Sequence, residues 1–348
     1  MKEMESHGLV ARNLKEAETT YFFMNSLIKD VIYGQMLFSQ RRQIHHTVAR
    51  MYLKYYADNT AYHPILAYHF KQAEEDEKAL YFYTKAGSLS LVSYANQEAV
   101  TFFNEAINLI QKLRSTRSVE DLTIERKLGQ AYFNLGQYRK AEQQFKKILD
   151  LLGLPMVSME DRKKSMKKRL FLNGKKGENV TSTGANSEKQ MKLQETVTAL
   201  LSVAKISLYT CNRDLMTDCA TLALSASENS NAGPSLEGEV LAINSVCAGL
   251  NLDYVGAQNY ISRSKKITER QIDVLAAVEL MNGLYHMGVA EWSKAEESFK
   301  IAIETVLPQT VGGDPKTYEQ CTIHLGTVQY LKGDIKLVTL PFPAIFLI

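Results

Sequence analysis

The sequence predicts an all-α fold, a solenoid of antiparallel helical hairpins. A spacing of small and aromatic residues recurs along the chain with a period near 40 residues. Apolar residues within each copy follow helical periodicity. The chain has 348 residues, of which 45% are hydrophobic and 23% charged, so it can bury a core in one elongated unit or two compact units.

The strongest copy of the spacing has small residues at Gly129 and Ala141 and aromatic residues at Tyr132, Tyr138 and Phe145. In a tetratricopeptide (TPR) repeat, small residues mark close helix crossings and aromatic side chains fill the space between the two helices. This segment therefore predicts a TPR-like hairpin. Stacked hairpins of this kind form a groove for other proteins and carry no chemistry of their own.

Further copies are found by aligning the small residue of the second helix with the apolar residue four positions later. The additional predicted core positions are Gly87, Ala99, Phe103, Gly283, Ala295, Phe299 and Gly326, with a looser copy at Ala257 and Ile261. The second-helix alanines are separated by 42, 116 and 38 residues. The long interval is expected to contain a linker and one degenerate repeat, for which residues 198–227 are the candidate.

The first seventy residues lack this spacing. Residues 21–24 are an aromatic, strand-like run, and Asn25 or Ser26 can cap the helix that follows. A second helix is predicted to carry an apolar face from Leu37 onward. Residues 67–70 are expected to form the inward face of a short helix before the repeats begin.

The order of residues in this segment resembles a known family. The run from Met36 to His45, followed by residues 67–69 and the repeat at Ala86 and Gly87, is similar to the soluble, bicarbonate-responsive adenylyl cyclases of vertebrates. The resemblance covers most of the chain and is strongest over residues 20–150. It implies a junction between a signal-transduction (STAND) ATPase module and helical repeats, with a winged-helix remnant ahead of the repeats and a role in cyclic AMP signalling.

The resemblance does not extend to catalysis. In that family two amino-terminal cyclase domains convert ATP to cyclic AMP with metal-binding aspartates, and an ATPase-like module with a phosphate-binding loop follows. Here the run Gly174–Gly177 lacks the preceding glycine and the hydroxyl residue that such a loop needs. No strand-rich segment is expected that would hold paired aspartates on a metal. We therefore predict no catalytic, cofactor-binding or metal-binding residues in this chain.

These patterns predict five segments. They are a winged-helix-like remnant with junction helices (1–70), TPR-like repeats (71–155), a basic and polar linker (156–192), further TPR-like repeats (193–336) and an apolar tail (337–348). The tail contains two prolines where the second helix of the last repeat should follow. We interpret it as a truncation or an alternative splice end.

The predicted linker contains a basic stretch. Its charged residues are Arg162, Lys163, Lys164, Lys167, Lys168 and Arg169. Such a stretch is typical of a contact with anionic lipid or calmodulin, or of a nuclear address. The small polar residues that follow it favour a solvated linker instead. The net charge of +3 does not indicate nucleic acid as a partner.

Cysteine and histidine usage does not indicate a metal site. Cys211, Cys219, Cys247 and Cys321 lie in helix-like apolar segments without CxxC spacing, so buried reduced thiols in a cytoplasmic protein are expected. Histidine is a common metal ligand, and the candidates here are His45, His46, His63 and His69. No carboxylate or cysteine completes a set of ligands with them. We expect His45 and His69 to pack at a helix junction.

Two functions are in contention. One is a regulatory and scaffolding region of a cyclase-like protein, and the other is a free-standing TPR adaptor. Both bind protein partners through the repeat groove. A direct enzyme is disfavoured because no nucleophile, general base or metal cluster emerges. No secretory leader opens the chain, and no apolar run reaches the roughly 20 residues that span a bilayer. A cytoplasmic location follows, with a nuclear one if the basic stretch is an address.

Overall fold

The part of the chain that the structure describes is all-α, as predicted, apart from one short hairpin of strands. The computed structural model describes residues 2–13, 20–56, 59–114, 116, 118–154, 183–228, 233–269, 271, 274–306 and 315–333. These fall into two compact units, Met1–Ala86 and Gly87–Ile348. The predicted tail (337–348) and most of the predicted linker (156–192) lie outside the described residues.

The N-terminal unit begins with a two-stranded antiparallel hairpin. Its elements in order are α1 (Lys2–Ser6), β1 (Val10–Asn13), β2 (Thr20–Phe23), α2 (Ser26–Gln35), α3 (Phe38–Tyr56), η1 (Thr60–Tyr62), α4 (His63–Gln72) and the first part of α5 (Asp76–Val92). Val10 pairs with Phe23 across the hairpin. The predicted capping of α2 is confirmed, since the Asn25 side chain accepts a hydrogen bond from the backbone N–H of Leu27.

The predicted helices of this unit are present, but their apolar faces are largely exposed. Leu27 of α2 is 69% exposed, and Leu37, just before α3, is 66% exposed. In α4, Ala67 and Phe70 are buried as expected, whereas Tyr68 is 47% exposed. A strand hairpin with these helices does not confirm the winged-helix remnant, which stays a prediction.

Histidines and tyrosines join α2, α3 and α4. His45 Nδ1 and His69 Nδ1 are 2.8 Å apart and share a hydrogen bond, and the Tyr33 hydroxyl lies 2.8 Å from His45 Nε2. The rings of Tyr68 and Tyr52 pack against these imidazoles. The expectation that His45 and His69 meet at a helix junction is confirmed.

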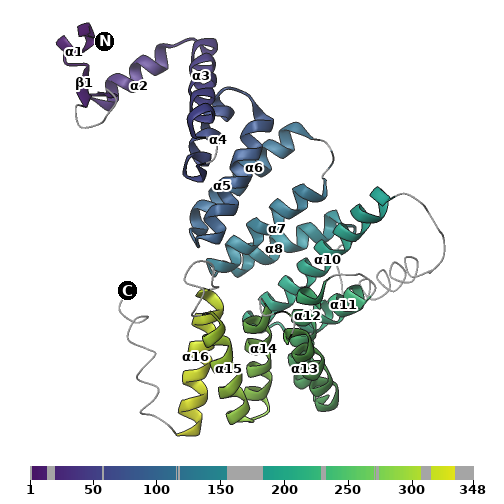
Figure 1. The fold of residues 1–348 in the computed structure, drawn as a ribbon. Helices are drawn as coiled ribbons and strands as arrows, with labels where there is room; N and C mark the ends of the chain where they lie inside the picture. The colour runs from purple at the N-terminus through teal and green to yellow at the C-terminus, as the bar shows by residue number, and fades with distance from the viewer. Residues whose placement is uncertain are drawn as a thin grey trace. The chain divides into compact units, whose positions relative to one another are not determined.

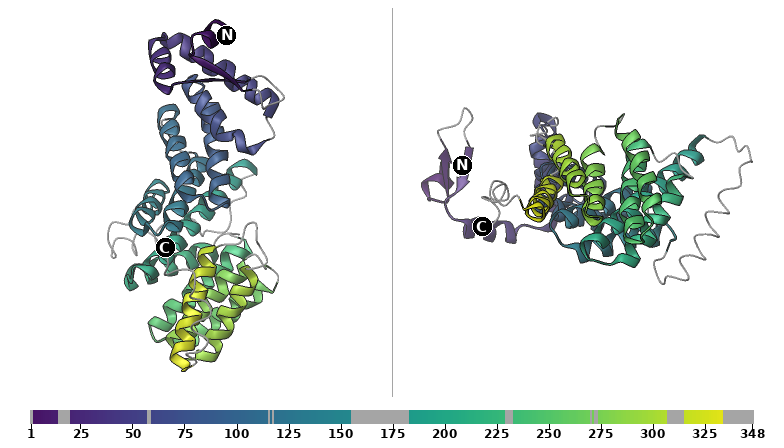
Figure 2. Two further views of the ribbon diagram at one scale, coloured as in Figure 1. Left: turned by 90° about the vertical axis from the view of Figure 1, so that its left-hand side faces the viewer. Right: turned by 90° about the horizontal axis from the view of Figure 1, so that it is seen from below.

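The C-terminal unit is a TPR-like solenoid of consecutive helical hairpins (Figures 1 and 2). After the end of α5, its helices are α6 (Asn96–Leu113), α7 (Val119–Asn134), α8 (Tyr138–Leu151), α10 (Thr183–Tyr209), α11 (Arg213–Glu228), α12 (Pro234–Leu250), α13 (Tyr254–Thr268), α14 (Leu275–Gly288), α15 (Trp292–Val306) and α16 (Pro315–Lys332). The hairpin of α10 and α11 occupies the interval where a degenerate repeat was predicted. Helix α10 also begins inside the predicted linker.

Three hairpins share one crossing, in which a glycine of the first helix faces a phenylalanine of the second. A Cβ atom placed on the glycine would lie 2.7 Å from the ring of Phe103 at Gly87, 2.9 Å from Phe145 at Gly129 and 2.5 Å from Phe299 at Gly283. All three phenylalanine side chains are buried. Hydrogen in place of a side chain therefore sets how closely the two helices approach.

In the C-terminal unit, the turn between the two helices of a hairpin has a residue in the left-handed conformation at the same position in each hairpin. In the strongest repeat this is Gly136, with φ of +71°, and the N–H of Gln137 donates to the carbonyl of Tyr132 over 2.9 Å. Non-glycine residues hold this conformation in the other hairpins of the unit: Tyr94, Cys211, Leu252 and Ala290. The backbone thus repeats more faithfully than the residue types do.

We expect Gly283→Ala to lower the free energy of unfolding by about 1–3 kcal/mol, because the new methyl group would overlap the buried Phe299 ring. Gly288, in the same helix, has no atom within 4 Å of the corresponding Cβ position. Gly288→Ala should therefore be neutral or stabilising. Urea denaturation of both variants tests the crossing, and equal stabilities would contradict it.

Acid should destabilise the histidine cluster. Burial lowers the pKa of His45 below the ordinary 6.5, and burial together with the charge of His45 lowers the pKa of His69. Below pH 6.5 the unfolded chain takes up protons that the folded chain does not, so the free energy of unfolding should fall as the pH drops from 6.5 through the lowered pKa values.

The pairing can be measured directly by NMR titration of the imidazoles. In His45→Gln the pKa of His69 should rise, because the neighbouring charge is removed. His63→Gln serves as a control and should leave the pKa of His69 in place. A His69 pKa that does not respond to His45→Gln would refute the coupling.

Candidate functional site

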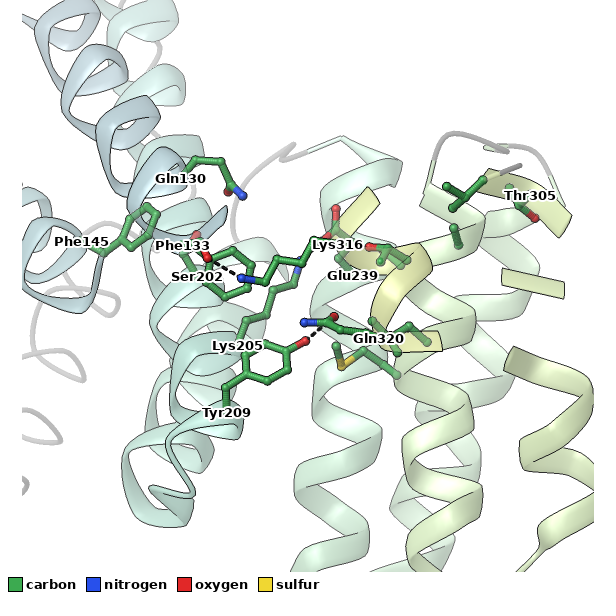
Figure 3. Close-up of a pocket in the computed structure, with 16 residues that line it drawn as sticks. Gln130, Phe133, Phe145, Ser202, Lys205, Tyr209, Glu239, Thr305, Lys316 and Gln320 are labelled. Carbon is green, nitrogen blue, oxygen red and sulfur yellow. Dashed lines mark hydrogen bonds and ion pairs between the residues drawn. The ribbon is translucent and has the colours of Figure 1, made fainter. Parts of the chain in front are cut away.

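A hollow of about 330 Å³, here called the first hollow, lies inside the C-terminal unit (Figure 3). Helices α7, α8, α10, α12, α14, α15 and α16 contribute its lining. Its polar residues are Gln130, Ser202, Lys205, Tyr209, Glu239, Thr305, Lys316, Thr317 and Gln320, and its larger apolar residues are Phe133, Phe145, Leu280, Met281 and Val306. The solenoid therefore presents hydrogen-bonding groups beside an apolar wall.

Two contacts organise the polar side of the first hollow. Lys205 of α10 forms an ion pair with Glu239 of α12. The Tyr209 hydroxyl donates a 2.6 Å hydrogen bond to Oε1 of Gln320 on α16, as Figure 3 shows. The second contact joins residues 111 positions apart in sequence, so it ties the last helix to an earlier repeat.

A second hollow of about 600 Å³ lies beside the first. Tyr209, Lys316 and Gln320 line both hollows and separate them. The residues found in the second hollow alone are Tyr94, Asn96, Asn134, Leu135, Gly136, Tyr138, Pro315, Glu319, Ile323 and His324. We refer to these two adjoining hollows together as the groove; side chains from α10 and α16 lie between them.

Three aromatic rings, which we call the aromatic cage, meet at this interruption. They are Phe133 at the end of α7, Tyr138 at the start of α8 and Tyr209 at the end of α10. Ring centroids are 5.6–5.8 Å apart, and Tyr138 stacks on Tyr209 with an interplanar angle of 12°. Burial, and then the negative charge of Glu319, raise the pKa of Tyr138.

Lys316 of α16 is bound in this cage. Its ammonium lies 4.1 Å from the ring centroid of Phe133 and 4.9 Å from that of Tyr138. The same ammonium donates a hydrogen bond to the backbone carbonyl of Phe133. Cation–π attraction is about 0.5–2 kcal/mol per contact, depending on solvent exposure, so the contact holds α16 against the earlier repeats.

The groove presents both hydrogen-bonding and apolar groups. Its hydroxyl, amide and charged groups can pair with a peptide backbone and polar side chains, while the half-buried Phe133, Ala277 and Val306 offer an apolar surface. Within the described residues, no group of three or more histidine, cysteine or acidic side chains is placed to hold a metal ion.

Most of the predicted repeat positions lie beneath the groove, although Tyr138 lines the second hollow. Ala99, Ala141 and Ala295 are fully buried, Gly326 is buried, and Phe145 alone among the predicted core residues lines the first hollow. Tyr132, predicted as a filler, is only half-buried, and the Lys140 ammonium lies 5.5 Å from its ring centroid.

Sequence reasoning missed the residues that form the groove. Lys205, Tyr209, Lys316 and Gln320 stand in unrelated sequence positions and follow no repeat spacing. A usable signal was present in Phe133 and Tyr138, two aromatic residues that flank the turn at Gly136. Aromatic side chains are enriched in protein interfaces relative to the rest of the surface.

The cysteine prediction needs one correction. Cys219, Cys247 and Cys321 are buried, and burial raises the pKa of Cys247 to about 12. Cys211 is exposed, contrary to prediction, because it occupies the left-handed turn position between α10 and α11 (φ of +55°). None of the four cysteines forms a disulfide.

The predicted basic contact residues (Arg162, Lys163, Lys164, Lys167, Lys168 and Arg169) lie outside the described residues, as does the glycine-lysine run at 174–177. Among the helices that the structure does describe, none combines the length and apolar character needed to cross a membrane.

Comparison with known proteins agrees with the repeat architecture. A tetratricopeptide repeat family profile matches residues 96–152, which span α6, α7 and α8. TPR repeats generally mediate protein–protein interaction. A stretch of 92 residues is 33% identical to human adenylate cyclase type 10 and covers 25% of this chain. The match spans 6% of the length of that protein. The chain thus contains TPR repeats and has a partial similarity to one adenylate cyclase.

Proposed function

We propose that this chain is a protein-binding scaffold whose groove accepts an extended segment of another protein. The observation that carries the proposal is the first hollow, where hydrogen-bonding groups from α7, α10 and α16 lie beside half-buried apolar residues of α7, α14 and α15. An extended segment has unpaired backbone amides and alternating side chains, and this lining offers partners for both. A rigid helical frame limits the entropy lost on binding.

The similarity to human adenylate cyclase type 10 supports a more specific proposal, that the scaffold acts in cyclic AMP signalling, in the cytoplasm and near a cyclase. In this form the chain regulates or anchors a catalytic partner. The alternative is a free-standing TPR adaptor with no connection to a cyclase. Sequencing the full transcript separates the two, because a cyclase-like protein would encode catalytic domains upstream. Under either form, the basic stretch of the predicted linker would direct a fraction of the protein to the nucleus.

Filling the first hollow should abolish partner binding. Ala277 lines it from α14 and is half-buried, so Ala277→Trp places an indole in the space a bound segment would use. Val255 on α13 is 84% exposed and lies outside both hollows, so Val255→Trp is the matched control. In affinity capture with quantitative mass spectrometry, partners should be reduced at least tenfold by Ala277→Trp and retained by Val255→Trp. Equal recovery with both variants would contradict the groove as the binding site.

The purified chain should form no cyclic AMP from ATP with magnesium or manganese. The cyclase proposal is tested by adding the chain to human adenylate cyclase type 10 and measuring cyclic AMP. We expect the wild-type chain to bind the enzyme and change its rate, and Ala277→Trp to do neither. Absence of binding would favour the free-standing adaptor. Cyclic AMP formation by the chain alone, lost on mutation within it, would overturn the scaffold proposal.

A further inference from the structure

The aromatic cage is built to bind a cation. The faces of Phe133 and Tyr138 carry the negative part of their ring quadrupoles, and the Phe133 carbonyl adds an acceptor at the same point. Glu319 adds negative charge near Tyr138. An ammonium or guanidinium group matches all of these features, whereas an anion matches none of them.

The occupant of this cage in the structure is the chain's own Lys316. This residue lies 183 positions after Phe133 in sequence and at the start of the last described helix. The second tie between the same parts is the hydrogen bond from Tyr209 to Gln320. Both ties lie at the boundary between the two hollows, so they close the groove midway.

We propose that α16 is a latch, with Lys316 closing the groove from within the aromatic cage, and that a basic segment of a partner protein opens it by inserting a lysine or arginine side chain in place of Lys316. The proposal rests on the groove being a protein-binding site. Displacement of Lys316 would remove one of the three side chains that separate the two hollows. The expected partner segment therefore contains a basic residue, flanked by residues that pack on the apolar wall of the groove.

The latch is tested with fluorescein-labelled hexalysine and the full chain, by fluorescence anisotropy at low ionic strength. Lys316→Ala vacates the cage, so hexalysine should bind it at least tenfold more tightly than wild type. Lys332→Ala is the matched control, since it removes the same charge from the same helix but lies at the other end of α16, paired with Glu296. It should change the affinity less than twofold.

The role of the rings is tested in the double variants Lys316→Ala with Phe133→Leu and Lys316→Ala with Tyr138→Leu. Each keeps an apolar side chain but removes one ring face, so each should lose most of the gain. Two different cage positions are used in case one variant shows a folding defect by circular dichroism. The other variant then still tests the role of the rings. Affinity that persists in a folded double variant would overturn the assignment of the cage.

Hydrogen exchange measures the latch itself. Amides in the first two turns of α16 should exchange faster in Lys316→Ala than in Lys332→Ala, and faster in wild type when hexalysine is added. Unchanged exchange, or an equal gain in hexalysine affinity from both lysine variants, would refute the latch. Ala277→Trp separates this outcome from failure of the proposed function, because it fills the first hollow and leaves every residue of the cage unchanged. Partner capture that is insensitive to Ala277→Trp rejects the groove as the partner site, whereas the hexalysine and exchange data judge the latch.

Discussion

The close crossing of two helices, made possible by a glycine against a phenylalanine ring, is the contact on which three hairpins of the C-terminal unit depend. At Gly87, Gly129 and Gly283 the space that a Cβ would need is already filled by the ring of Phe103, Phe145 or Phe299. Each ring in turn is shielded from water. The hairpin therefore has one closest approach, and truncation of such a ring to alanine would cost about 3–5 kcal/mol through lost burial and a cavity.

The hairpin turn adds a second constraint of the same kind. A left-handed residue ends the first helix, and the N–H of the following residue returns to a carbonyl of that helix, as with Asp253 and Ala248 over 2.9 Å. Leu252 and Ala290 hold this conformation without being glycine, at a cost of roughly 1–2 kcal/mol each. Packing of the flanking helices over-determines the turn and offsets that cost.

Regular hairpins stacked in this way bring distant residues together. Tyr209 and Gln320 meet at the groove, as do Phe133 and Lys316, although each pair is separated by several repeats. Polar ties between neighbouring hairpins hold the register, such as Arg126 to Glu195. The groove is therefore formed by the stack and not by any single repeat. Stacked repeats commonly form extended binding surfaces of this kind.

The sequence by itself determined the helical class, the hairpin period and the buried core. Small and aromatic residues at fixed spacing are a local pattern. The pattern predicts the hairpins because each hairpin packs mainly on itself and its neighbours. The α10 and α11 hairpin could be inferred only from an interval, since Ala204 and Ala220, both fully buried, replace the glycine and the ring there.

Only the tertiary structure decided which residues form the site. Lys205, Tyr209, Lys316 and Gln320 are polar residues that no spacing distinguishes from solvated ones, and they become a groove because the stack curves until α16 contacts α7 and α10. The exposure of Cys211 was decided in the same way, by the backbone of a turn whose sequence carries no glycine. Local periodicity records which side chains a helix buries, whereas contacts between residues over a hundred positions apart depend on the summed rotation of every hairpin between them.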